Sequence, residues 1–321
     1  MNILPKFSVV VACHNEAENV PALLERLRRV FEPIKEPYEV VLIDDGSTDD
    51  TLPLALESQR QYRELTVVEL SRNFGHQAAV TAGFEIARGQ AIILMDADLQ
   101  DPPEVIPEMI AKWREGYDVA YGQRIRREGE TLFKKVSATL FYRLFRRISK
   151  LNLPVDTGEF RLMDRKVVDA LKQMTERQRF LRGMVTWIGY RQTTVQYARE
   201  ARRAGETHYP LRSMLRLAWD AFASFSSFPI HCLYYAGMLL VLVGLVGAVT
   251  GFRRIDEPGH EPLVFALGGV VAVLTGILLL GMKVLGEYIS RTYEETKKRP
   301  LYLVRQIHRA GAGVPAPAHE A

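Results

Sequence analysis

Three carboxylates and one glutamine lie within six residues of the sequence LMDADLQDPP. Asp96, Asp98 and Gln100 alternate along the chain directly after the apolar run 91–95, at the tip of an expected buried strand. Carboxylate and amide oxygens are the ligands that Mg²⁺ or Mn²⁺ prefers, and such a cation uses one or two carboxylates together with substrate phosphates. The motif therefore predicts a divalent-metal site that handles phosphates.

Two more polar clusters come directly after apolar runs, CHNE at residues 13–16 and DDGS at residues 44–47. In open strand–helix sheets, ligands bind beyond the carboxyl ends of the strands. We therefore expect both clusters to share one rim with the metal motif. His14 and His76 have no partner at metal-ligand spacing, and we expect His76 to order its loop rather than to do chemistry.

The first 120 residues alternate strand and helix patterns, which predicts an α/β, Rossmann-like domain whose mostly parallel sheet is covered on both faces. The expected strands are 7–12, 39–43, 66–70, 91–95 and 118–121, and the expected helices are roughly 17–30, 50–61, 75–87 and 103–114. Ser47, Thr48 and Asp49 offer N-caps for the second helix, and Pro103 suits a first helical turn. The chain has neither a P-loop lysine motif nor a GxGxxG after its first strand, which argues against those nucleotide folds.

The bulk composition limits the class further. The chain has 321 residues, a net charge of +4 and two cysteines, Cys13 and Cys232, which lie far apart. They suggest neither a disulfide framework nor a zinc site, and a reducing cytosolic face is the simpler interpretation. The N-terminus lacks a signal-peptide layout, and the mild charge leads us to expect no nucleic-acid partner.

A basic amphipathic helix is expected at residues 123–150, where nine Lys or Arg stand against two Glu. Its apolar residues recur at spacings of three and four. Two interpretations remain open, a solvated helix packed on the core and a helix lying on an anionic membrane surface.

Two uncharged apolar stretches, 229–252 and 263–282, are each long enough to cross a bilayer as a helix. The short polar connection between them predicts a transmembrane hairpin. Basic residues flank its outer ends, so the positive-inside rule puts the N-terminal domain and the C-terminus in the cytoplasm. Gly247 and Gly251 form a GxxxG pair that permits close helix packing and allows a homo-oligomer.

The chain resembles glycosyltransferase family 2 in five ordered segments and in the hairpin. The segments are VVVACHNEAENV, VLIDDGSTDDT, SRNFGHQAAVTAGFEIARG, MDADLQDPPE and DTGEFRLMDR. They look most like the polyprenyl-phosphate branch, which includes dolichyl-phosphate mannosyltransferases and bacterial undecaprenyl-phosphate glucosyltransferases.

The resemblance implies a GT-A fold and an inverting transfer of a hexose from a nucleotide sugar to a polyprenyl phosphate at the cytoplasmic leaflet. It implies donor-binding roles for Glu16, Asp45 and Asp96, and a metal role for Asp98 and Gln100. Asp96 borders the metal as well. Asp44 could bind donor or cap its turn.

The catalytic base is where this chain departs from the pattern, because Glu159 stands where the family resembles TGDFRLMDR. Asp156 is a nearby competitor, and Asp98 also belongs to the expected catalytic group. The acceptor is a phosphate monoester whose second pKa is near 6, so it is mostly a dianion at pH 7. The orientation of this phosphate and the neutralisation of its charge then matter more than a strong base.

Two anionic substrates beside several carboxylates require cations. The candidates for binding the acceptor phosphate or the donor diphosphate are Arg161, Arg202, Arg203, Arg124 and Arg126. Near Arg202 the family resembles R-x-x-G-x-[ST]-K, but here His208 replaces the Lys, and histidine titrates near neutrality.

The predicted organisation is a GT-A domain at 1–210, a juxtamembrane amphipathic segment at 211–228, a transmembrane hairpin at 229–286, an interfacial helix at 287–310 and a disordered tail at 311–321. We expect an inner-membrane enzyme that uses UDP-glucose and undecaprenyl phosphate and needs a downstream flippase. GDP-mannose and UDP-linked aminosugars, including aminoarabinose derivatives, remain alternative donors. A processive polysaccharide synthase lacks support because no Gln-x-x-Arg-Trp motif is present, and a non-catalytic nucleotide-sugar-binding protein would not need the intact acidic motifs.

Overall fold

The computed structural model describes residues 4–125, 157–200 and 261–309, together with a few positions between 235 and 246. The chain divides into two units. The first includes the described residues 4–125, 157–200 and 299–309, and the second includes residues 261–298.

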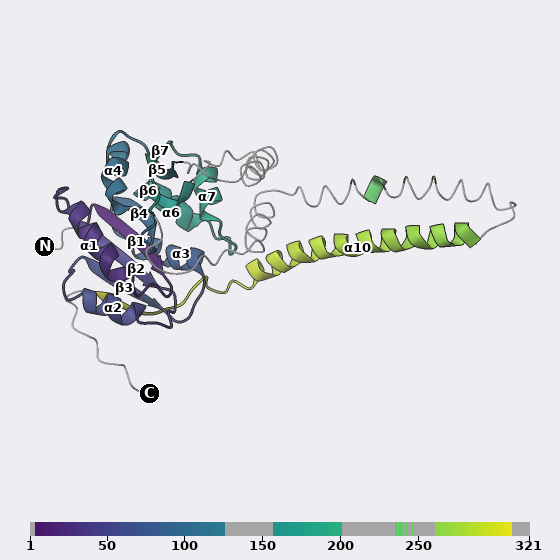
Figure 1. Ribbon diagram of the computed structural model, residues 1–321, viewed down its shortest axis with the longest axis horizontal. Coiled ribbons are helices and arrows are strands. Elements are labelled where there is room, and N and C mark those ends of the chain that lie inside the picture. The colour runs from purple at the N-terminus through teal and green to yellow at the C-terminus, as the bar shows by residue number, and fades with distance from the viewer. Residues whose placement is uncertain are drawn as a thin grey trace, which may run out of the picture. The chain divides into compact units, whose positions relative to one another are not determined.

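The first unit is built on one sheet of eight strands in the order β7-β5-β6-β4-β1-β2-β3-β8 (Figure 1). The strands are β1 (Phe7–Cys13), β2 (Tyr38–Asp44), β3 (Leu65–Leu70), β4 (Ala91–Asp96), β5 (Val119–Arg124), β6 (Thr157–Asp164), β7 (Gln192–Tyr197) and β8 (Val304–Arg309). Strands β3, β2, β1 and β4 are parallel neighbours, whereas β6 runs antiparallel between β4 and β5. The reversed β6 therefore begins at the rim where the parallel strands end.

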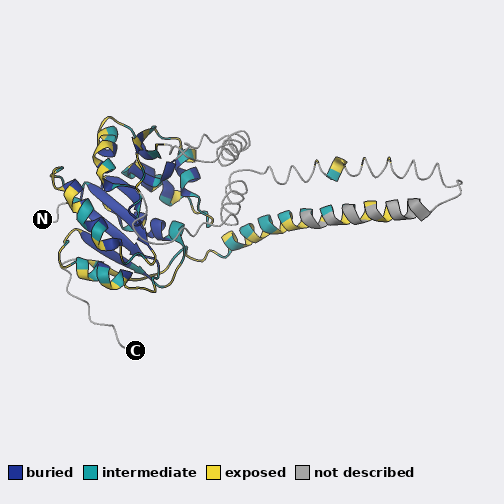
Figure 2. Cartoon of the chain, in the orientation of Figure 1, coloured by how far each residue is buried: buried dark blue, intermediate teal, exposed yellow. Residues whose placement is uncertain are grey.

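Helices cover both faces of this sheet. They are α1 (Val20–Phe31), α2 (Thr51–Ser58), α3 (His76–Ile86), the short 3-10 helix η1 (Pro103–Val105), α4 (Ile106–Arg114), α6 (Arg165–Gln173) and α7 (Leu181–Ile188). Alternate residues of the strands pack against α1 and α4 in the main apolar core, and α3 packs on β1 and β2. Figure 2 shows the strands as the most deeply buried part of the unit.

Gly83 explains the close approach of α3 to the sheet. A Cβ there would lie 2.4 Å from a methyl group of Val10 and 2.8 Å from Ile43, so a larger residue would push the helix away. Apolar burial on both faces fixes the strand ends, and with them the site described below.

The five strands expected from the sequence are confirmed, and so is the mostly parallel α/β sheet. The second-helix cap differs in detail, since the side chain of Asp49 accepts from Thr51 N at 3.1 Å while Asp50 occupies the N-cap position. The basic helix expected at 123–150 starts too early, because Gln123 and Arg124 belong to β5; its remainder from residue 126 lies outside the described residues.

The expectation of a helix over 287–310, broken near Pro300, is wrong for the part beyond Pro300. Helix α10 (Glu261–Thr296) ends before Pro300, and β8 then pairs antiparallel with the free edge of β3. Arg305 donates to Glu69 at 2.7 Å across this pair. The first unit therefore does not stop at residue 210, because residues after 299 return to its sheet.

The second unit includes α10, which contains the stretch 263–282. In the described part of the chain, no helix combines the length and apolarity required to cross a bilayer. The juxtamembrane segment 211–228, the tail 311–321 and most of the stretch 229–252 lie outside the described residues.

Candidate active site

The carboxyl ends of the parallel strands carry the predicted polar clusters to one rim. Cys13 pairs with Asp44 in the β1–β2 register, and Ala12 pairs with Asp96 in the β1–β4 register. Because these pairs lie at or next to the last positions of their strands, the CHNE, DDGS and DADLQ segments leave the sheet side by side. The convergence expected from the sequence is confirmed.

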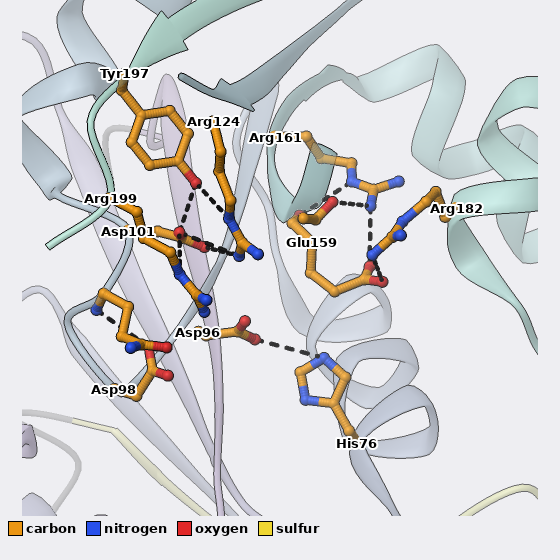
Figure 3. Close-up of polar contacts among 12 residues, drawn as sticks. His76, Asp96, Asp98, Asp101, Arg124, Glu159, Arg161, Arg182, Tyr197 and Arg199 are labelled. Carbon is orange, nitrogen blue, oxygen red and sulfur yellow. Dashed lines mark hydrogen bonds and ion pairs between the residues drawn. The ribbon is translucent and has the colours of Figure 1, made fainter. Parts of the chain in front are cut away.

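Asp96 lies at the centre of this rim (Figure 3). Its Oδ1 is 3.7 Å from Nε2 of His76, the first residue of α3. Burial raises the pKa of Asp96 to about 6; the positive charge of His76 opposes the shift, and the nearby carboxylates of Glu159, Asp101 and Asp98 add to it. A carboxyl group that is held among other carboxyl groups gains most from a cation.

The turn after Asp96 is tightly constrained. Leu99 has a φ of 57°, an uncommon left-handed conformation for a residue of its type, and its side chain is buried. The backbone N–H of Gln100 donates to Oδ1 of Asp98 at 3.1 Å. This turn fixes Asp98 beside the strand end, and such constrained backbone is common at functional sites.

Asp101 is the hub that joins this turn to two other strands (Figure 3). Its carboxylate is 1% exposed and accepts from the hydroxyl of Tyr197 at 2.5 Å and from Arg124 at 3.2 Å. Arg199 Nε lies 3.8 Å away, and the N–H of Glu200 donates to the carbonyl of Gln100 at 3.0 Å. Asp101 therefore has its charge balanced internally and holds the ends of β5 and β7 against the metal motif.

Glu159 reaches the same rim from β6. Leu94 pairs with Arg161 in the antiparallel β4–β6 register, so continuing that register by two residues brings Glu159 opposite Asp96. The Glu159 carboxylate accepts from Arg161 at 3.0 Å and lies 3.7 Å from Nη2 of Arg182. Burial alone would raise the pKa of Glu159, but the charges of Arg161 and Arg182 outweigh burial and hold that pKa below its ordinary value.

The DDGS turn is tied to the loop between β3 and α3. Asp45 accepts from the backbone N–H groups of Phe74 at 2.7 Å and Gly75 at 2.8 Å, so both its oxygens are engaged. His14 contacts the carbonyl of Asp45 at 3.0 Å and the side chain of Asn73 at 3.1 Å. These bonds give Asp45 and His14 a structural role in ordering the rim.

Asp44 also caps its own turn, as one of the two interpretations expected. Its oxygens accept from the N–H of Ser47 at 3.4 Å, and burial raises the pKa of Asp44. Glu16 accepts from the side chain of Asn19 at 2.6 Å near the start of α1, on the same rim. Donor-binding roles for Glu16, Asp44 and Asp45 remain predictions.

The arginines fall into separate groups. Arg161 has no exposed surface and donates to Glu159 and to the carbonyl of Gly158, so in this structure it compensates Glu159 rather than reaching toward solvent. Arg124 compensates Asp101. Asp156, Arg126, Arg202, Arg203 and His208 lie outside the described residues.

The sequence interpretation missed three contributors to the site. His76 was expected only to order its loop, yet its Nε2 lies 3.7 Å from the Asp96 carboxylate and is buried without a hydrogen bond in the described part of the chain. Arg182 and Asp101 were not selected. QRFLR at residues 178–182 was the only available signal for Arg182, because no spacing rule links α7 to β6.

The donor set fits a hard divalent cation. Among the residues that the structure describes, no group of three or more His, Cys, Asp and Glu side chains is arranged to ligate a metal. Mg²⁺ does not require such a cage, since one or two carboxylates plus substrate phosphates suffice. Asp96 and Asp98, with Gln100 beside them, provide such a partial set.

The chain belongs to glycosyl transferase family 2, whose model matches residues 8–172. It is therefore a glycosyltransferase, with the GT-A type of α/β fold. It is 44% identical over 308 residues to the uncharacterized glycosyltransferase YkcC of Bacillus subtilis, covering 94% of each chain. It is 37% identical to the prophage bactoprenol glucosyl transferase homolog of Escherichia coli, covering 94% of this chain and 99% of that one. The bactoprenol glucosyl transferase of Shigella phage SfII is 36% identical over 311 residues, covering 95% of this chain and 99% of the relative.

Proposed function

We propose that the protein transfers glucose from UDP-glucose to undecaprenyl phosphate, with inversion at the sugar carbon. The observation that carries this proposal is the meeting of Asp96, Asp98 and Glu159 at one rim, with arginines behind Glu159. Relatives named bactoprenol glucosyl transferase, which match nearly the whole chain, support a polyprenyl phosphate as acceptor and glucose as the sugar.

Glu159 acts in this proposal as an ionised group. Its lowered pKa keeps it charged at neutral pH, where the acceptor phosphate is already mostly a dianion. The Glu159 carboxylate therefore acts mainly by orienting the acceptor phosphate and the neighbouring arginines, and removal of a proton is less important. The phosphate oxygen forms the new bond to the sugar carbon as the bond from that carbon to the diphosphate breaks, and UDP leaves.

Asp96, Asp98 and Gln100 would hold Mg²⁺ or Mn²⁺. Such a cation supplies charge neutralisation for the departing diphosphate. The carboxyl pair repels that diphosphate when no cation is bound, which makes donor binding dependent on the metal. The Asp101 hub keeps the turn that carries both ligands in place.

A membrane anchor suits an acceptor whose headgroup cannot leave the bilayer. We propose that the uncharged stretches 229–252 and 263–282 form a transmembrane hairpin, with the catalytic unit and the C-terminus on the cytoplasmic side. In α10 the apolar side chains of Val271, Leu278 and Met282 are exposed, and exposed apolar surface of this kind requires a partner such as lipid. Inner-membrane location would be tested by fractionation, with alkaline carbonate extraction leaving the full-length chain in the pellet.

Transfer itself is the deciding experiment. Detergent-purified protein is incubated with Mn²⁺ or Mg²⁺, undecaprenyl phosphate and one of four donors: UDP-glucose, UDP-galactose, UDP-N-acetylglucosamine or GDP-mannose. Mass spectrometry of the lipid then reports the mass added. We expect one hexose from UDP-glucose and none in Asp98→Ala. If only another donor gives a product, the sugar named in the proposal is wrong. If no donor gives a product, the proposed function is overturned.

A further inference from the structure

Two arginines flank Glu159, and their hydrogen bonding is unequal. Arg161 donates to the Glu159 carboxylate, to the Glu159 carbonyl and to the Gly158 carbonyl, all at 3.0 Å, and it is fully buried. These bonds hold Arg161 in place, although its buried Nη1 has no hydrogen-bond partner among the described residues.

Arg182 is different. Its guanidinium forms an ion pair with Glu159 at 3.7 Å, which is too long for a hydrogen bond. Its Nε is buried and has no hydrogen-bond partner among the described residues. Its side chain keeps 23% of its surface exposed, whereas that of Arg161 keeps none.

The position of Arg182 adds a second argument. Figure 3 shows its guanidinium and the His76 ring approaching the Glu159 carboxylate from different elements, with Asp96 nearby. The charge of Asp101 is already balanced by Arg124 and Arg199, so Asp101 does not need Arg182 as a partner. A guanidinium carries five donors in a planar fork that matches phosphate oxygens, and among the described residues the Nε donor of Arg182 is unused.

We propose that Arg182 binds a phosphate group of a substrate, its fork turning from the loose ion pair with Glu159 to phosphate oxygens. This inference rests on the proposed function, because it assigns Arg182 to the anions of that reaction. The phosphate belongs either to the lipid acceptor or to the donor diphosphate, and both offer the same chemistry. Glu159 then serves to hold the fork at the rim until the anion arrives.

The test uses the full chain in detergent with three variants. Arg182→Gln removes the charge and the fork, Arg182→Lys keeps the charge only, and Arg63→Gln changes an exposed arginine far along the sequence as the matched control. Four quantities are measured: kcat, the KM for undecaprenyl phosphate, the Kd for UDP with Mn²⁺ by calorimetry, and the melting temperature.

We expect Arg182→Gln to lose about 10- to 100-fold in affinity for one anion, as for the loss of hydrogen bonds to a charged group. A raised KM for the lipid with an unchanged Kd for UDP assigns the lipid phosphate. A raised Kd for UDP assigns the donor diphosphate. Arg182→Lys should recover part of the loss, and Arg63→Gln should match the wild type within twofold.

Three results would overturn the inference. One is that both affinities in Arg182→Gln stay within twofold of the control. Another is a shifted pH–rate profile without any change in affinity, because Arg182 would then act only through Glu159. The third is a fall in melting temperature in Arg182→Lys as large as in Arg182→Gln, with equal loss of both affinities, which marks a folding role.

The proposed function can fail separately. If the wild type forms no product with any donor, direct binding of UDP and of undecaprenyl phosphate to the wild type and to Arg182→Gln still decides the inference. Weaker binding of either anion by the variant supports a phosphate contact without transfer, and equal binding of both overturns it.

Discussion

The carboxylate of Asp45 accepts a 2.8 Å hydrogen bond from the backbone N–H of Gly75, while its other oxygen accepts one of 2.7 Å from Phe74. Asp45 and Gly75 are 30 positions apart, and α3 begins directly after Gly75. One buried side chain therefore sets where that helix, and His76 at its start, meets the rim.

Asp45→Asn should lower the free energy of unfolding by about 1–3 kcal/mol, because the new amide leaves one backbone N–H facing another donor. Thermal unfolding in detergent measures this, with Asp50→Asn as control, since Asp50 is exposed and its side chain makes no capping bond. If UDP affinity falls while stability matches the control, Asp45 contacts the donor directly and the structural role is wrong.

Gly46 allows the DDGS turn to touch the backbone of the neighbouring loop. Its φ is +64°, and a Cβ there would lie 2.5 Å from backbone atoms of Arg72 and Asn73. Gly116 also has a positive φ, but a Cβ there would meet only an arginine side chain at 3.6 Å. The two glycines thus separate conformational strain from steric contact.

Gly116→Ala should cost about 1 kcal/mol of unfolding free energy, the strain of a left-handed alanine. Gly46→Ala should cost at least about 2 kcal/mol more, because a fixed backbone cannot move aside. Chemical denaturation of both variants gives the difference. Equal losses would mean that the two loops are not packed as described.

Substitution of Asp101 should destabilise the protein more than substitution of an ordinary surface carboxylate. Asp101→Asn leaves Arg124 and Arg199 without their counter-charge, and breaking a buried ion pair from one side costs about 3–5 kcal/mol. Tyr197→Phe removes the 2.5 Å hydrogen bond to Asp101 and the 3.2 Å bond that Arg124 donates to the hydroxyl, but no charge, and should cost about 1–2 kcal/mol. Thermal unfolding of both variants tests this order, and a reversed order would contradict the hub.

The sequence predicted the strands and the shared rim because both follow from local patterns. Apolar runs of five or six residues mark buried parallel strands, and Cys13, Asp44 and Asp96 lie at their ends by position alone. The metal motif was readable for the same reason, since its ligands are two residues apart.

Contacts between distant segments were not readable in this way. Arg182 on α7 meets Glu159 on β6 only in the tertiary fold, and β8 pairs with β3 across more than 230 residues of chain. The VRQIHR segment followed a long helix, so continued helix was the simpler interpretation, and only the free edge of β3 explains the strand. His76 was judged by its neighbours in sequence, whereas its role depends on Asp96.

Glu159 should behave as a permanently charged group. Its folded pKa is lowered from 4.5, so the stability it contributes is present above that pH and is lost as the pH falls through the folded value. Any activity change between pH 5.5 and 7.5 must then come from another group, and the acceptor phosphate titrates near 6.

Glu159→Gln should lower kcat by about 100-fold, the scale of lost positioning in an active site, with UDP affinity unchanged. The midpoint of the pH–rate profile should stay where it is in the wild type. Glu159→Asp restores the residue typical of the resembling family and should keep activity within about tenfold. A profile whose midpoint moves in Glu159→Gln would show that Glu159 itself titrates during turnover.

Asp96 carries the opposite pH dependence. Its pKa is raised from 3.8 to about 6 in the folded state, mainly by burial. Between these values the folded protein binds more protons than the unfolded chain, so the free energy of unfolding falls as the pH rises, and the whole penalty is present above pH 6.

Asp96→Asn should therefore stabilise the metal-free protein at pH 7.5, by about 1–2 kcal/mol once solvent screening of a side chain that is 32% exposed is allowed for. The gain should vanish near pH 4, and it should be absent in Asp50→Asn. Added Mn²⁺ should raise the melting temperature of the wild type more than that of Asp96→Asn, because binding to the folded state stabilises it. Thermal unfolding of the wild type and the two variants is measured in EDTA and in Mn²⁺, at pH 4 and at pH 7.5. A variant that is less stable than the wild type at pH 7.5 without metal would mean that Asp96 is held by favourable contacts rather than waiting for a cation.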